Sequence, residues 1–600
     1  MIASRQKNMA GLHKLGTFAI SLSPYGVSVF MQHSLKFFHY CKNIEYNSIV
    51  QMMGAFMKKT CSILIPAFFL LTACQTQHLP STSSSEVSSS EEKSEVSSSE
   101  ESSSSKEETP VQDNISYEMG VSGNEAVLKK VKGSSPVASI PATYEGKPVT
   151  RILDGAFKDK TKITKVVVPE NVTSIGVDTF LGCTNIEEIS LPSTLRNIGK
   201  RAFVGLRYIK NINIPEGVET IGDSAFSNCV NLENISLPST LKDLGSNLFQ
   251  SDKLVTYVYK GIEYLGNSSN QHLLAYKVNA KNAAPEEVEL HPDTKIVGGS
   301  LFESEKSLTK VTLNEGLEVI CASAFRSCPF ESIVIPSSVK RIDQYAFASC
   351  ANMTTCTISG DSLETIGNEA FSGTIKLASI NIPSSVKEVG SYAFTEYDNP
   401  GALTYNEKDG GNYLGNTENP YHVFVGLKDT KATSLTLDEH TVVMAGQCLR
   451  DAKGISSFNI PASVETIGEE AFFQMTSLTS MSIPATVKNM GGNLFNSCSS
   501  LTSIELLNKP TVLGSGFAGN CEKLASINIP DSVTKLESNL FDRDESLTEL
   551  YVPNSVLEAS ASAITSCPNL TVNVGFQEKP YLFDTTWCTG VKALHYGMNK

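Results

Sequence analysis

The chain has 600 residues, 40% of them hydrophobic, so it is too long for one single-core domain and forms either several domains or one repeat array. Its formal net charge of −14 argues against a nucleic-acid-binding protein, which needs a basic face for phosphates. One Trp and nine His leave little material for a haem pocket or a multi-histidine metal centre. No apolar run of about 18 residues occurs, so no transmembrane helix is predicted.

Residues 57–73 are predicted to be a lipoprotein signal peptide. They begin with the basic stretch Met57-Lys58-Lys59 and continue with an apolar core from Ile63 to Leu71. Leu71, Thr72, Ala73 and Cys74 resemble a bacterial lipobox, in which the Cys thiol carries a diacylglycerol and becomes the first residue after cleavage. Cys74 is therefore the predicted lipid attachment site; the alternative is a buried Cys in an apolar stretch.

Residues 1–56 do not fit in front of a signal peptide. We interpret them as an over-extended start, with translation from Met57, and a long leader is the alternative. Residues 74–113 are predicted to be a disordered tether, because 15 of the 28 residues from Ser81 to Glu108 are Ser and eight are Glu. Residues 1–73 carry a net charge of +6, so the chain from Cys74 has a net charge of −20.

The rest of the chain is dominated by a period of about 23 residues. One aromatic or aliphatic residue recurs at intervals of 22 to 24 residues in three blocks of five, five and six coils. These residues are Phe157, Phe180, Phe203, Phe226 and Phe249; Phe302, Phe325, Phe347, Phe371 and Phe394; and Leu449, Phe472, Phe495, Phe517, Phe541 and Ile564. A fixed period of this length is typical of stacked repeats that bury one continuous core.

Other positions recur in step with the aromatic residue. An Ile such as Ile175 stands five residues before it, and an alternating apolar pair such as Ile212 and Ile214 follows it and is mostly ended by Pro. The pair predicts a short strand, the Ile predicts a second inward segment, and the Ala-Phe pair predicts a short helical turn. The fold class is therefore a β-rich solenoid of about 23-residue coils with short strands and short helical turns.

The repeated strings resemble the BspA-like leucine-rich repeat family. The clearest runs from Ile460 to Phe472, and Val172 to Phe180 and Val339 to Phe347 are similar. The resemblance implies a leucine-rich-repeat solenoid on a bacterial surface lipoprotein, and it implies a role in adhesion or co-aggregation. It gives an N-terminal cap and first block at 114–249, a second block at 302–394, a third at 449–575 and a C-terminal cap at 576–600, where the period breaks.

Two segments, 250–301 and 395–448, interrupt the period and are predicted to be hairpin-like insertions. Tyr264-Leu265-Gly266-Asn267 recurs 149 residues later as Tyr413-Leu414-Gly415-Asn416, which indicates a duplicated device with Gly-Asn near its turn. One interpretation is that each insertion only bridges two half-solenoids. The other is that exposed Tyr264, Tyr276, Tyr413 and Tyr421 form a partner-binding edge, because aromatic anchors often dominate interfaces.

Six cysteines follow their aromatic or aliphatic residue by three positions, and Cys521 follows Phe517 by four. A thiol in a repeating slot indicates core packing, with oxidation of the stacked pairs Cys328/Cys350 and Cys498/Cys521 as the alternative. No Cys-x-x-Cys, His-Glu-x-x-His, Gly-x-Ser-x-Gly or phosphate-binding loop occurs, so neither metal, cofactor nor enzymatic activity is predicted.

The outward positions of the predicted strands carry short hydrogen-bonding side chains such as Asn211, Asn213, Ser480 and Ser482. They indicate either a merely soluble sheet face or a lane for extended protein or glycan ligands. We therefore predict a non-catalytic lipoprotein, attached to the membrane only by its lipid on the outer side of a bacterial cell. Its predicted partners are a host matrix or surface protein or a glycan; an envelope scaffold and a solenoid-borne carbohydrate-active enzyme are the alternatives.

Overall fold

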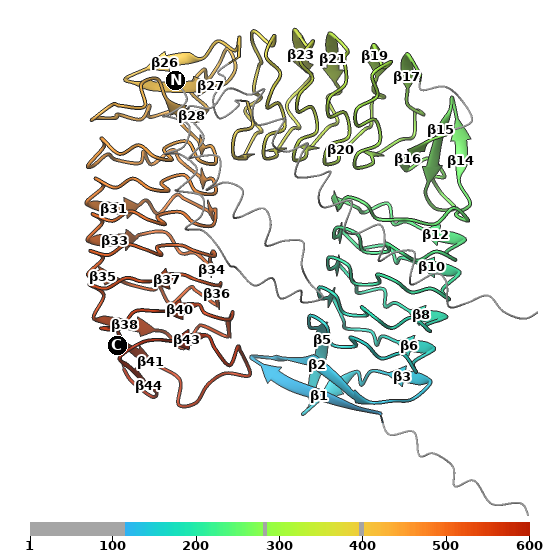
Figure 1. Cartoon of the computed structure of the whole chain (residues 1–600), viewed down its shortest axis with the longest axis horizontal. Coiled ribbons are helices and arrows are strands. Elements are labelled where there is room, and N and C mark those ends of the chain that lie inside the picture. Colours follow the sequence, from blue (N-terminus) through green and yellow to red (C-terminus); the bar gives the residue numbers. More distant parts are fainter. Residues whose placement is uncertain (1–114, 280–284, 395–400, 600) are drawn as a thin grey trace, which may run out of the picture. The chain divides into compact units, whose positions relative to one another are not determined.

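The computed structural model describes residues 115–279, 285–394 and 401–599, and the statements below concern these residues. The predicted signal peptide, Cys74 and the tether lie outside them. Most coils contribute one short strand to each of two sides of the stack (Figure 1). The 23-residue solenoid is thus confirmed. No membrane-spanning helix occurs within the described ranges.

The first strand of each coil contains the apolar residue that stands five positions before the aromatic one. In the first block Ile152, Ile175, Ile198, Ile221 and Leu244 pair in parallel register and are all buried. These first strands are β5 Lys147–Ile152, β7 Ser174–Ile175, β9 Asn197–Ile198, β11 Thr220–Ile221, β13 Asp243–Leu244, β18 Ile296–Val297, β20 Val319–Ile320, β22 Arg341–Ile342, β24 Thr365–Ile366, β25 Glu388–Val389, β29 Val443–Met444, β30 Thr466–Ile467, β32 Asn489–Met490, β34 Val512–Leu513, β36 Lys535–Leu536, β39 Glu558–Ala559 and β42 Leu582–Phe583.

The second strand of each coil contains the alternating apolar pair, and its side chains alternate between the core and the surface. These second strands are β3 Val137–Ser139, β6 Lys165–Val167, β8 Glu188–Ser190, β10 Asn211–Asn213, β12 Asn234–Ser236, β17 Glu287–Glu289, β19 Lys310–Thr312, β21 Ser332–Ile335, β23 Thr355–Ile358, β31 Ser480–Ile483, β33 Ser503–Leu506, β35 Ser526–Ile527, β38 Glu549–Val552, β41 Thr571–Val574 and β44 Ala593–His595. Three further two-residue strands lie near the aromatic position of the last coils and pair with one another. They are β37 Phe541–Asp542, β40 Ile564–Thr565 and β43 Cys588–Thr589.

The aromatic residues form a buried column between the two strand sets. The rings of Phe180, Phe203 and Phe226 stack with centroids 5.4 and 5.1 Å apart and with interplanar angles of 10°. All three side chains are essentially inaccessible to solvent. Each ring therefore contacts the rings of both neighbouring coils, which makes the core continuous along the stack.

The segment around the aromatic residue is a hydrogen-bonded turn, so the predicted short helical turns are wrong. No helix occurs among the described residues. The Phe180 amide donates to the Ala202 carbonyl of the next coil at 2.8 Å instead of to its own coil. Asp178 (φ 54°) and Gly182 (φ 81°), two residues before and after the ring, adopt left-handed backbone that ends a helix after one turn.

Hydrogen bonds correct the expected register in the third block. Phe495 N donates to Phe517 O and Ala518 N donates to Leu540 O, so Ala518, not Phe517, occupies the aromatic position. Cys521 therefore stands three residues after this position, as the other repeat cysteines do. The expected break in the period at residue 576 is also wrong, since Phe583 pairs with Ala559 and Trp587 is buried in one further coil.

Each insertion is an antiparallel sheet of three strands, which confirms the predicted hairpins and extends them. The strands are β14 Tyr257–Tyr259, β15 Ile262–Leu265 and β16 Leu274–Val278 in the first insertion, and β26 Asn406–Lys408, β27 Gly411–Leu414 and β28 Val423–Leu427 in the second. The third strand of each rejoins the parallel stack, β16 beside β18 and β28 beside β29.

The expected Gly-Asn pair lies at the second turn of each insertion. In the first insertion Asn267 Oδ1 accepts the Asn270 amide at 2.8 Å, and a Cβ on Gly266 would lie 2.0 Å from the Asn270 carbonyl oxygen. The first turn is made by Lys260 and Gly261, whose φ angles of 45° and 82° match the left-handed geometry of a two-residue hairpin turn.

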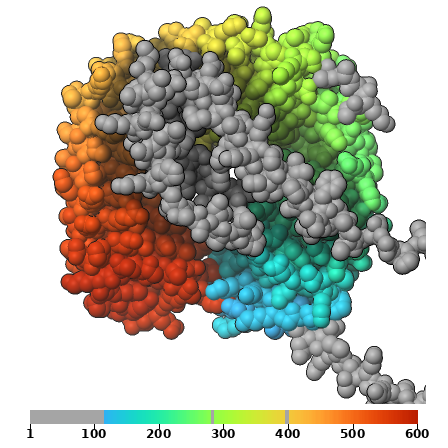
Figure 2. Space-filling model, in the orientation of Figure 1, coloured from blue at the N-terminus to red at the C-terminus, as the bar shows by residue number. Residues whose placement is uncertain are grey.

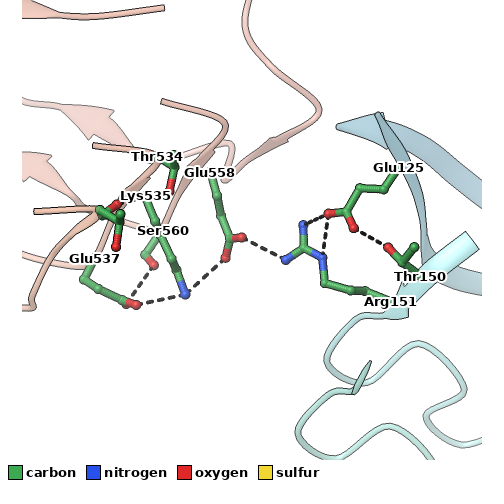
Figure 3. A network of polar contacts seen from close by, with 9 residues as sticks. Glu125, Thr150, Arg151, Thr534, Lys535, Glu537, Glu558 and Ser560 are labelled. Atoms are coloured by element: carbon green, nitrogen blue, oxygen red, sulfur yellow. Dashed lines mark hydrogen bonds and ion pairs between the residues drawn. The ribbon is translucent and has the colours of Figure 1, made fainter. Parts of the chain in front are cut away.

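The beginning and the end of the solenoid are in contact. Two antiparallel pairs open it, β1 Ile115–Ser122 with β2 Glu125–Gly133 and β4 Thr143–Tyr144 with β5. Arg151 on β5 forms ion pairs with Glu125 on β2 at 3.0 Å and with Glu558 on β39 at 3.1 Å (Figure 3). In the space-filling view the blue N-terminal coils accordingly meet the red C-terminal coils (Figure 2).

Candidate functional site

Tyr264 and Tyr413 are buried, which corrects the expectation that they form an exposed edge. Both side chains are 0% exposed. The Tyr264 hydroxyl oxygen accepts the His291 amide, and the Tyr413 hydroxyl oxygen accepts the Asp438 amide, each at 3.2 Å. Burial raises the pKa of both phenols. The third strand of each insertion pairs with the parallel stack, and the neighbouring strand that carries each tyrosine therefore packs its side chain into the core.

Tyr276 and Tyr421 are half-buried and also contribute to packing. Tyr276 lies edge-on to Phe249 with ring centroids 5.7 Å apart, and burial raises its pKa to about 12. Tyr421 lies edge-on to Tyr413 at 5.4 Å, and Lys408 Nζ lies 4.9 Å from the Tyr421 ring centroid. The structure thus brings Tyr413 and Tyr421 together but presents none of the four predicted tyrosines as a free anchor.

The outward side chains of the second strands are exposed, as the sequence predicts. Asn211 and Asn213 on β10, and Ser480 and Ser482 on β31, alternate with buried apolar neighbours. Adjacent coils are linked along this face, since Asn234 Nδ2 donates to Asn211 Oδ1 at 2.7 Å. The exposed positions form a polar ladder: Ser190, Asn211, Asn213, Asn234, Thr312, Ser332, Ser379, Asn381, Ser457, Asn459, Ser480, Ser482, Ser526 and Asn528.

A polar hollow of about 230 Å³ lies where the second block meets the third, and the sequence reasoning missed it. Its lining includes Tyr345, Asn368, Glu369, Tyr392, Gln447 and Glu470. These residues come from five successive coils, and each lies two or three positions before the aromatic or aliphatic residue of its coil. The signal in the sequence is weak, because the same positions elsewhere carry varied residues, mostly Ser, Asn, Asp or Gly but also Lys200 and Arg201.

Hydrogen bonds hold part of this lining in place. The Tyr345 hydroxyl donates to Glu369 Oε1 at 2.9 Å, and Gln447 Nε2 donates to Glu470 Oε2 at 2.8 Å. Arg450 forms an ion pair with Glu470. Burial and the neighbouring Glu470 together raise the pKa of Glu469, a further lining residue.

The repeat cysteines are packing residues. Each thiol donates to the carbonyl oxygen of the aromatic residue one coil earlier, as Cys229 Sγ does to Phe203 O at 3.2 Å. Burial raises the pKa of the Cys229 thiol to about 11. Every cysteine of the described ranges is free, including the stacked pairs Cys328/Cys350 and Cys498/Cys521. No group of three or more His, Cys, Asp or Glu side chains in those ranges is placed to hold a metal ion.

Several solved structures of bacterial leucine-rich repeat proteins are similar to this chain. A leucine-rich repeat protein from Bacteroides ovatus is 21% identical, with 81% of this chain and 91% of that chain covered and a TM-score of 0.23. A leucine rich cell surface protein from Faecalibacterium prausnitzii is 20% identical over 80% and 92%, with a TM-score of 0.23. One from Eubacterium ventriosum is 16% identical over 79% and 91%, with a TM-score of 0.28.

No curated protein sequence matches this chain. The family model described as the BspA type leucine rich repeat region matches it with six copies, over residues 150–274, 280–399 and 444–571. These ranges contain the aromatic column of all three blocks and most of the first and second strands. The repeated core and the family match agree, and the chain belongs to the BspA-type leucine-rich repeat family.

Proposed function

We propose that this protein is a non-catalytic lipoprotein of the bacterial cell surface that binds a host matrix or surface protein, or a glycan, through the polar ladder. The observation that carries the proposal is the exposure of short hydrogen-bonding side chains at the same two positions of many coils, whether or not the segment forms a strand. Rungs on neighbouring strands are spaced by about 4.8 Å, so an extended ligand meets many of them.

The physical basis of such binding is the sum of many weak contacts. Ser, Thr and Asn side chains both donate and accept hydrogen bonds, and their short stems lose little rotamer entropy when they are ordered. Each contact is weak alone, but contacts linked on one rigid stack reinforce one another through effective concentration. The binding role also agrees with the predicted lipobox at Cys74, because a lipid attached there would hold the solenoid on the outer side of the cell.

Two pairs of arginine substitutions test the ladder. Ser480→Arg with Ser482→Arg places two bulky charges on β31, whereas Ala485→Arg with Thr486→Arg places them on exposed turn residues of the same coil. We expect binding to immobilised matrix proteins or glycans to fall about tenfold or more in the ladder pair only. If both double variants bind equally well, the polar ladder is not the binding surface. Binding confined to the producing cell's own envelope would identify a scaffold, and turnover of a bound glycan would identify an enzyme.

The anchor has its own test. Cys74→Ala removes the thiol that would carry the lipid, so the protein is expected in the medium or as uncleaved precursor. Cys61→Ala, in the same leader region, is the matched control and should leave membrane retention unchanged. A processed, unlipidated Cys74→Ala protein that still fractionates with the membrane would contradict the anchor.

A further inference from the structure

The polar hollow lies beside the second insertion, and the first insertion provides a built-in comparison. Five lining residues, Tyr345, Glu369, Tyr392, Gln447 and Glu470, each stand two positions before the aromatic or aliphatic residue of their coil. The corresponding residues around the first insertion are Arg201, Ser224, Asn247, Ser300 and Ser323. Both sets have the same left-handed backbone, with φ between 51° and 59°. Since Ser, Asn and Arg occupy these positions with the same backbone, the coil does not require the tyrosine, glutamate and glutamine side chains of the hollow.

Most hydrogen-bond donors of the lining side chains donate to other residues at the hollow. The Tyr345 hydroxyl donates to Glu369, and the Gln447 amide nitrogen and Arg450 both donate to Glu470. In contrast, the Gln447 side-chain carbonyl oxygen is buried and accepts no hydrogen bond from any described residue. A buried acceptor without a donor is costly, and Gln447 lines the hollow, so a ligand N–H that reached this oxygen would remove the cost.

The negative charge of the lining also favours a ligand that donates hydrogen bonds and carries positive charge. Glu369, Glu469 and Glu470 line the hollow, and Glu470 alone of the three forms an ion pair with a cation in the described ranges. Burial and then the neighbouring carboxylate of Glu470 raise the pKa of Glu469. Around the first insertion the corresponding region balances itself, because Lys200 pairs with Asp223 at 3.3 Å and Arg201 pairs with Asp178.

We propose that the hollow binds the guanidinium or ammonium group of a basic side chain on a protein partner. Such a group only donates hydrogen bonds, which matches the free Gln447 oxygen and the carboxylates of Glu369 and Glu469. The phenol rings of Tyr345 and Tyr392 border the hollow, and such rings favour a cation over an anion. The Tyr345 ring already has the Arg326 guanidinium 5.2 Å from its centroid. This inference rests on the proposed protein-binding function and names the chemistry that one site would recognise.

Peptides with one changed side chain test the proposal on the whole chain. The probe is a fluorescent arginine pentapeptide, compared by anisotropy with its lysine form and with its neutral citrulline form. We expect the arginine and lysine peptides to bind and the citrulline peptide to bind at least about tenfold more weakly. Glu469→Gln, Glu369→Gln and Gln447→Leu should each weaken binding of the basic peptides about tenfold. The exposed Glu187→Gln in the first block is the matched control and should leave it unchanged.

Three outcomes would overturn the assignment: equal binding of the citrulline peptide, no effect of the three hollow variants, or occupancy of the hollow by a neutral oligosaccharide in place of the basic peptide. A thermal melt of each variant separates loss of binding from loss of fold. Ladder-dependent attachment with no basic-peptide binding would refute the hollow alone. Basic-peptide binding that depends on Glu369 and Glu469 but without any ladder effect would instead refute the proposed function alone.

Discussion

Arg151 and Glu558 are 407 positions apart in the sequence, yet Arg151 Nη1 lies 3.1 Å from Glu558 Oε2. Glu558 also pairs with Lys535 at 3.2 Å, and Arg151 with Glu125, so four alternating charges join β2 and β5 to β36 and β39 (Figure 3). The Arg151 and Glu558 side chains are 28% and 29% exposed, so water screens the pair and its own contribution to stability is small.

The contact between the two ends can be tested at Gly120 and Tyr581. A Cβ on Gly120 would lie 1.9 Å from Tyr581 Cε1, so Gly120→Ala must displace the ring. We expect Gly120→Ala to destabilise the protein by about 1–3 kcal/mol in urea unfolding. Gly120→Ala combined with Tyr581→Ala should cost less than the sum of the two single changes, because the ring is then absent. Strictly additive costs would show that the two residues do not meet in solution.

The aromatic column predicts local damage from a core substitution. Phe203 is inaccessible to solvent and stacks between Phe180 and Phe226, so Phe203→Ala should cost about 3–5 kcal/mol through the cavity left behind. Because the coil of Phe203 stacks on the coils of Phe180 and Phe226, hydrogen exchange should accelerate in residues 157–249 before it does in 449–575. Uniform acceleration along the whole chain would contradict this nearest-neighbour stability.

Because the insertion tyrosines are buried, replacing them should lower stability, whereas replacing exposed tyrosines would leave stability nearly unchanged. Tyr264→Ala should cost about 3–5 kcal/mol, and Tyr264→Phe about 1 kcal/mol, since the phenylalanine leaves the His291 amide without its acceptor. Tyr257 pairs with Tyr264 across β14 and β15 but is 38% exposed, so Tyr257→Ala is the matched control and should change stability by about 0.5 kcal/mol or less. A well-folded Tyr264→Ala protein with wild-type melting would contradict the burial.

Asp544 predicts a pH dependence of stability. Its side chain is 0% exposed, and burial raises its pKa to about 8, although its Oδ1 accepts the Cys521 amide at 2.7 Å. An unfolded Asp loses its proton near pH 4, so between about pH 4 and 8 the folded state holds a proton that the unfolded state has lost. The Asp544 contribution to stability is therefore largest below pH 4 and is lost as pH rises through about 8.

Asp544→Asn should remove this slope and stabilise the protein by at least about 1 kcal/mol near pH 8. Urea unfolding at several pH values between 4 and 8 measures both quantities. Asp531→Asn, which changes an exposed carboxyl, is the control and should retain the wild-type slope. A slope that survives Asp544→Asn would mean that another buried group, such as Asp343, sets it.

The sequence by itself determined the solenoid, the two insertions and the polar ladder. Each coil repeats the same buried positions, so the period of Phe157, Phe180 and Phe203 is enough to predict how one coil packs on the next. No contact between residues distant in sequence is needed for this prediction. Alternation around Ile212 likewise predicted that Asn211 and Asn213 face solvent. The predicted short helical turns are hydrogen-bonded turns instead, because residues such as Asp178 and Arg201 adopt left-handed backbone here and their residue types alone do not predict it.

Only the tertiary structure decided which residues of the insertions are available to a partner. Tyr264 and Tyr413 are buried because the third strand of each insertion returns to the stack, a path that a broken period does not specify. The polar hollow collects side chains from coils separated by the second insertion, and the Arg151–Glu558 pair joins the first coils to the last. Local periodicity fixes how one coil packs on the next, whereas these features depend on how distant coils are placed in space.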